Sequence, residues 1–131
     1  MSLSSSPEDL GSSDAGVTRS AAMDVASINA LAENQLATAT SAESGRSSVT
    51  VYGRSGARLR QTVIALAKGR MMGEHKSPGD ASVLCLTGRL LLRAGESQAE
   101  LGPGDLLAVP PQRHDIEALE HSVLLLTVAL H

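Results

Sequence analysis

The chain has 131 residues, a length typical of one domain. Its formal net charge of −3 at pH 7 argues against a nucleic-acid or anionic-membrane surface, which needs a clustered basic face. With one Tyr, no Phe and no Trp, the core must be aliphatic, and a platform that stacks bases is excluded.

Residues 1–23 are rich in Ser, Gly, Ala and Asp and contain few large apolar side chains. Such a segment cannot bury enough apolar surface to offset the entropy lost on ordering, so we expect a disordered tail. It lacks the basic region and apolar stretch of a secretory signal, and no run in the chain approaches the roughly 20 apolar residues of a membrane span. With a single cysteine, which fits a reducing compartment, these features predict a cytoplasmic protein.

Residues 24–45 change to a helical pattern. Asp24 or Ser27 can cap a helix by accepting backbone N–H bonds. Apolar and small residues then recur at three- and four-residue spacing, with no Pro or Gly before Gly45: Ile28, Leu31, Ala32, Gln35, Leu36 and Ala39. The pattern predicts one amphipathic helix that packs on the outside of the main fold or across a dimer partner. Its polar face carries no Lys or Arg, which argues against a membrane-surface helix.

Residues 46–131 have a β pattern. Short apolar runs separated by turn signals, without a second helix, predict an all-β sandwich or barrel. Gly88-Arg89 is expected to form a hairpin connection, and Gly102–Asp105 a turn. The expected strands are Val49–Tyr52, Leu59–Ala67, Ser82–Thr87, Leu90–Arg93, Gln98–Leu101, Leu106–Val109, His114–Ala118 and Val123–Leu130.

Two stretches of this region each carry a histidine in a distinctive setting. Pro110-Pro111 removes two backbone donors, so it must end one strand before the next begins at His114. Earlier in the chain, strand alternation places His75 and Ser77 on one face. The same alternation groups Ala81, Val83 and Cys85, and likewise His114, Ile116 and Ala118.

These stretches resemble the two motifs of the cupin superfamily. Gly69, His75 and Gly88 match the first motif, G-x5-H-x-H-x3,4-E-x6-G. Ser77 stands at its second histidine position and Ala81 at its glutamate position.

The second motif, G-x5-P-x-G-x2-H-x3-N, is matched in part. Gly104 and Pro110 are in register, and His114 takes the histidine position one residue early. Gln112 replaces the glycine and Ala118 replaces the asparagine.

The resemblance covers roughly residues 47–130 and is strongest to small, mostly uncharacterised bacterial single-domain cupins. It implies a double-stranded β-helix, or RmlC-like jelly-roll barrel, with one short N-terminal helix. It also implies a homodimer, and the apolar run Val123–Leu130 has little polar face to expose to water. The barrel pocket would be lined by His75, Ser77, Ala81, Cys85, His114 and Ile116.

The family's full site holds a divalent metal through three histidines and a carboxylate, a set suited to Fe, Mn, Ni or Zn. Here His75 and His114 remain, while Ser77 is a weak ligand and Ala81 none. Two interpretations stay open: a metal site built on the two imidazoles, or a metal-free polar pocket in which they bond to each other, to Ser77 or to water. Cys85 could complete a Zn²⁺ site or be a small buried hydrophobe.

Two further sets of polar residues are expected to be surface features. His121 is expected in a solvent-facing turn. Arg54, Arg58 and Arg60 are expected to form a solvated basic edge.

For function, the sequence favours a small-molecule-binding or sensing cupin without catalysis, with its ligand in the barrel. Histidine changes charge near neutral pH, so the pair suits an anionic or polar ligand. The alternatives are a divalent-metal-dependent enzyme of oxygenase or isomerase type and a structural module with a vestigial pocket. Neither a catalytic residue nor a ligand is defined by the sequence.

Overall fold

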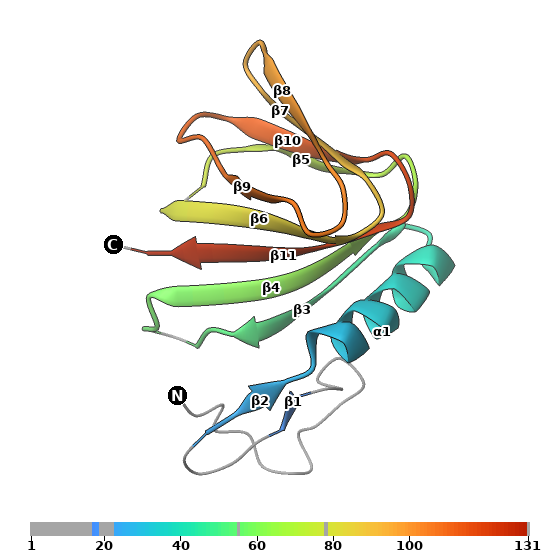
Figure 1. Ribbon diagram of the computed structural model, residues 1–131, viewed down its shortest axis with the longest axis vertical. Helices are drawn as coiled ribbons and strands as arrows, with labels where there is room; N and C mark the ends of the chain where they lie inside the picture. The colour runs from blue at the N-terminus through green and yellow to red at the C-terminus, as the bar shows by residue number, and fades with distance from the viewer. Residues whose placement is uncertain (1–16, 19–22, 55, 78, 131) are drawn as a thin grey trace.

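A computed structural model describes residues 17–18, 23–54, 56–77 and 79–130, with the backbone alone at 17–18, 74 and 75. Two antiparallel sheets face each other, and a helix lies on the outside of one of them (Figure 1). The described elements are β1 (Val17–Thr18), β2 (Val25–Ala26), α1 (Ile28–Ser41), β3 (Arg46–Tyr52), β4 (Leu59–Leu66), β5 (Met71–His75), β6 (Asp80–Thr87), β7 (Leu90–Ala94), β8 (Ser97–Leu101), β9 (Leu106–Ala108), β10 (His114–Ala118) and β11 (Ser122–Ala129).

The two sheets are interleaved along the chain. One has the order β3-β4-β11-β6-β9 and the other the order β5-β10-β7-β8. The chain passes from one sheet to the other at every connection from β4 to β11 except that between β7 and β8. This alternation is the topology of a double-stranded β-helix, as the sequence predicted.

The predicted hairpin at Gly88-Arg89 is wrong, because β6 and β7 belong to different sheets. Gly88 has φ +85°, and a Cβ there would lie 2.3 Å from the carbonyl oxygen of His121. Glycine is needed because the crossing chain passes directly against the β10–β11 connection. The β7–β8 connection at Gly95, in contrast, is a hairpin within one sheet.

The main core fills the space between the two sheets. Strand alternation sends every second side chain into this space, and the residues that meet there are almost all aliphatic. The buried members are Ile64, Leu66, Val83, Cys85, Leu90, Leu92, Ala94, Leu101, Ile116, Ala118 and Leu124.

A second core lies between α1 and the outer face of the five-stranded sheet. Ser27 caps the helix, since its Oγ accepts a bond from the backbone N–H of Ala30 at 3.3 Å. Leu31, Gln35 and Ala39 are the buried helix residues. The predicted helix and its position outside the barrel are therefore confirmed.

The apolar strand β11 has both faces covered within the chain. Leu124 and Leu126 pack in the main core, while Val123 and Leu125 pack on the helix side. The central position of β11 between β4 and β6 accounts for its composition. The homodimer remains a prediction that this strand no longer supports.

Near the N-terminus, β1 pairs with β2, with Val17 opposite Ala26. The sequence did not predict this pairing within the expected tail, most of which (1–16 and 19–22) lies outside the described residues. Within the described part of the chain, no helix has the length and hydrophobicity needed to cross a membrane.

Candidate functional site

His114 lies at the start of β10, between β5 and β7. It is 3% exposed, and Ile116 and Ala118 on the same face are buried in the main core. Its Nδ1 is 3.1 Å from the carbonyl oxygen of Gln112. A carbonyl oxygen only accepts, so Nδ1 carries a proton and donates this bond.

The backbone of His75 lies directly opposite His114 in the β5–β10 pair. The pairing is irregular between His114 and Ile116, because Ile116 faces Met72, three residues before His75. This is a bulge on β5 at Gly73 and Glu74, and such a bulge bends a strand and re-aims its side chains. The side chain of His75 lies outside the described part of the structure.

Ser77 does not share a strand face with His75, contrary to prediction. β5 ends at His75, and Ser77 lies half-buried in the connection to β6. The reason is topological: the chain must pass from one sheet to the other before β6 begins at Asp80. Ala81 is half-buried near the start of β6, and its methyl group offers no ligand atom.

Cys85 is fully buried in the main core near the far end of β6. Its thiol donates to the carbonyl oxygens of Thr87, at 3.5 Å, and Gly88, at 3.8 Å. Burial raises the pKa of the thiol above its ordinary value, and the charge of Asp105 raises it further. The protonated, buried thiol therefore has the character of a small hydrophobe.

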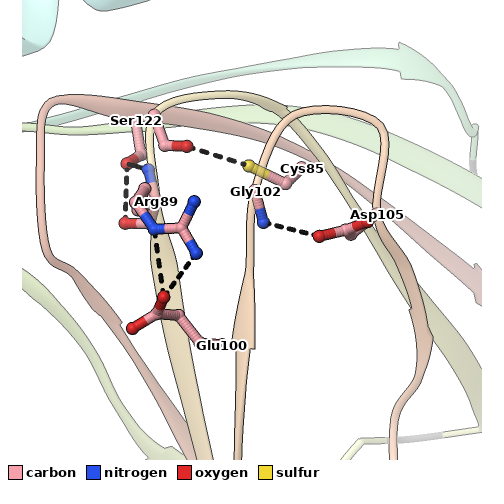
Figure 2. Close-up of polar contacts among 7 residues, drawn as sticks. Cys85, Arg89, Glu100, Gly102, Asp105 and Ser122 are labelled. Atoms are coloured by element: carbon pink, nitrogen blue, oxygen red, sulfur yellow. Dashed lines mark hydrogen bonds and ion pairs between the residues drawn. The ribbon is translucent and has the colours of Figure 1, made fainter.

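Around Cys85, polar contacts hold together the end of the barrel where β6 crosses to β7 (Figure 2). The buried Oγ of Ser122 accepts from the backbone N–H of Arg89 at 3.0 Å. The guanidinium of Arg89 forms an ion pair with Glu100. Asp105 Oδ2 accepts from the backbone N–H of Gly102 at 2.8 Å. These contacts are structural.

At the opposite end of the barrel, a cavity of about 490 Å³ is lined by Thr50, Gly53, Arg54, Arg60 and Thr62. Arg54, Arg58 and Arg60 are exposed, as the sequence predicted, but sequence reasoning missed that Arg54 and Arg60 line a cavity. The signal was present in β4: its alternation puts residues 60 and 62 on the same face as Ile64 and Leu66, which lie in the main core.

His121 is exposed, as expected for a turn residue. It also has a structural role, because its Nδ1 accepts from the backbone N–H of Lys68 at 2.9 Å. This bond ties the β4–β5 turn to the β10–β11 turn.

The residues at the motif positions do not fit a four-ligand metal centre. Ser77 offers a neutral hydroxyl and Ala81 nothing, which leaves two imidazoles. Among the side chains that the structure describes, which do not include that of His75, no three of His, Cys, Asp or Glu lie together as metal ligands.

No family model and no curated protein matches the chain. Several solved structures are similar to the chain. A conserved protein of unknown function from Streptococcus pyogenes is 30% identical, with a TM-score of 0.62 over 69% of this chain and 78% of that one. A cupin superfamily protein from Desulfitobacterium hafniense is 22% identical, with a TM-score of 0.61 over 66% and 78%. The DMSP lyase DddQ from Ruegeria pomeroyi is 20% identical, with a TM-score of 0.57 over 64% and 46%.

The fold is thus that of a double-stranded β-helix protein with an aliphatic barrel interior. Together with these similarities, it places the chain in the cupin superfamily. The similar structures include both a lyase and a protein of unknown function, so membership alone does not define a reaction.

Proposed function

We propose that the protein is a small-molecule-binding or sensing cupin without catalysis of its own, with its ligand in the barrel beside His75 and His114. One observation carries the proposal: buried His114 lies directly opposite His75 in register. Residues opposite each other on antiparallel strands carry their side chains on one face, with Cβ atoms about 4.5–5.5 Å apart. The two imidazoles would therefore adjoin inside the barrel.

Such a pair suits a polar ligand. The Nδ1–H of His114 is used by the carbonyl oxygen of Gln112, so Nε2 is the ring atom that His114 would present to a ligand. The His75 imidazole and the Ser77 hydroxyl would add further polar atoms. Ala81 and Ile116 would complete the pocket as its apolar wall, whereas Cys85, which the sequence also assigned to the lining, is buried toward the opposite end of the barrel. Polar groups set in a mostly apolar wall are typical of small-molecule sites.

The absence of catalysis is proposed from the motif positions. Ser77 and Ala81 replace a histidine and a carboxylate that a resident metal would use. The alternative is a metal-dependent enzyme of oxygenase or isomerase type, in which His75 and His114 are joined by water or substrate ligands. A cytoplasmic location is part of the proposal, supported by the free thiol of Cys85.

The experiment is a thermal-shift screen of metabolites with the full chain. A true ligand should raise Tm, and His75→Ala and His114→Gln should abolish the rise while the apo proteins stay folded by circular dichroism. His121→Gln is the matched control, since His121 is exposed in the β10–β11 turn, at the other end of β10 from His114. A Tm rise that persists in both pocket variants would place binding elsewhere and refute the proposal.

A further inference from the structure

We propose that the ligand carries an anionic group, a carboxylate or a phosphate, which Arg54 and Arg60 bind at the β3–β4 end of the barrel. This inference rests on the proposed function for the remainder of the ligand. It adds the chemical class of the ligand and two residues that would select it.

The cavity at this end is built from the inner face of the five-stranded sheet. Thr62 lies opposite Leu126, a residue packed against the main core, and Thr50 lies opposite Thr62. Arg60 precedes Thr62 by two residues and shares its face. The cavity of about 490 Å³ lies within the range of about 300–1,000 Å³ typical of small-molecule sites.

Gly53 makes room for the guanidinium-bearing side chain. A Cβ at Gly53 would lie 3.3 Å from Cγ of Arg60, tighter than an ordinary contact. Its φ of +143° also disfavours any residue with a side chain. The backbone is thus shaped around the stem of Arg60.

The two arginines of this cavity have no carboxylate partner in the part of the chain that the structure describes. The ion pairs there involve other arginines: Arg89 with Glu100, and Arg93 with Asp115 and Glu117. Two cations that line one cavity repel each other, and a bound anion would replace that repulsion with attraction. Guanidinium groups bind carboxylate and phosphate through paired hydrogen bonds, and threonine hydroxyls can donate to the same oxygens.

The arginine cavity and the histidine pair lie at the same end of the barrel. Arg60 is opposite Val128 on β11, and Val128 is opposite Ala81 on β6. Next to them, Gly79 packs so closely on Ala129 that a Cβ would lie 2.2 Å from its carbonyl oxygen. Figure 1 shows the β3–β4, β5–β6 and β9–β10 connections gathered at this left-hand end.

The chain connection between β5 and β6 limits the distance between the histidine pair and the arginine cavity. His75 precedes Gly79 by four residues, which span at most about 14 Å. One metabolite-sized ligand could therefore place a polar group between the imidazoles and its anionic group on the arginines.

The test uses isothermal titration of the full chain with three probes: inorganic phosphate, D-gluconate and D-glucose. We expect at least one anionic probe to bind with a Kd of about 1 mM or tighter, and D-glucose to bind more weakly than either. Arg54→Gln and Arg60→Gln should each weaken the anion by about tenfold or more. Arg58→Gln is the matched control: Arg58 is exposed on the same stretch, outside the cavity lining, and its loss should change the Kd less than about twofold.

The outcomes separate this inference from the proposed function. Binding lost in the arginine variants but kept in His114→Gln supports the anion site and refutes the shared pocket. Ligand binding that needs the histidines but not the arginines refutes the anion site and leaves the proposed function standing. No binding of either anion to the wild type, or equal binding of D-gluconate and D-glucose, also refutes the anion site. Whether phosphate or gluconate binds more tightly distinguishes the two anionic groups.

Discussion

His114 on β10 and His75 on β5 lie directly opposite each other, at the end of the barrel away from buried Cys85. The bulge beside them sets this register, because without it His114 would face a different residue of β5. The two ends of the barrel therefore differ in the residues that they carry. Polar contacts around Ser122 and Arg89 hold one end together, while the histidines and the arginine cavity lie at the other.

Gly88→Ala should strongly destabilise the fold. The new Cβ would meet the carbonyl oxygen of His121 at 2.3 Å, on a backbone with φ +85°. We expect a loss of at least about 3 kcal/mol in the free energy of unfolding, measured with urea. Gly69→Ala is the control: Gly69 has φ +84° but no heavy atom within 4 Å of its Cβ position, so strain alone should cost about 1–2 kcal/mol. Equal losses in the two variants would show that the close approach at Gly88 has no energetic weight.

Ser122→Ala should remove the polar link at the β6–β7 crossing. The hydroxyl accepts from the backbone N–H of Arg89, and its proton can go to the carbonyl of Glu120 at 2.8 Å. A buried amide left without an acceptor costs about 1–3 kcal/mol, so the urea midpoint should fall accordingly. In Thr127→Ala, which removes a half-buried bond to Gln61, the loss should stay at or below about 1 kcal/mol. A Ser122 variant as stable as wild type would contradict the structural role of this cluster.

Cys85 should make the fold less stable at alkaline pH. Burial and Asp105 raise the thiol pKa in the folded state, so the thiol of the unfolded chain ionises first as pH rises. Below the ordinary thiol pKa the two states bind this proton equally. Above it only the unfolded thiol has lost its proton, so stability falls with pH, and the loss levels off once the folded thiol also ionises. Urea unfolding of the wild type and Cys85→Ala at neutral and alkaline pH should show a larger alkaline loss for the wild type. Parallel pH profiles would rule out this contribution.

Metal analysis tests the enzyme alternative. Loss of a single supporting contact typically lowers metal affinity about 10–100-fold, and two direct ligands are missing here. Protein purified without chelator should therefore contain well under one metal per chain by elemental analysis, and EDTA should not change its Tm. The control is His75→Ala, which should have the same metal content. Stoichiometric metal that disappears in this variant would instead favour a metal-dependent enzyme.

Much of the architecture could be predicted from local signals. The helix showed its cap and its buried stripe, and Pro110-Pro111 fixed the start of β10 before His114. Strand alternation was applied to His75 and Ser77, but the bounds of β5 were not predicted, since Met71–His75 shows no alternation and contains a glycine. Its pairing with β10 through a bulge is a long-range feature.

Other features depended on which sheet a strand joins. Gly88-Arg89 has the local signal of a hairpin, but tertiary packing sends β6 and β7 to different sheets. Strand alternation places Arg60 on the inner face of β4. Whether the opposite sheet covers the end of that face depends on the separation of the two sheets. Local sequence does not encode that separation, so the cavity was missed.

The most direct test of the account is whether the two imidazoles meet inside the barrel. Nuclear Overhauser effects from selectively labelled histidine rings report which protons lie close together. We expect cross-peaks between the rings of His75 and His114, and their absence in His75→Ala. Cross-peaks from the His75 ring to Asp115, the outward-facing neighbour of His114 on β10, with none to the His114 ring, would contradict it.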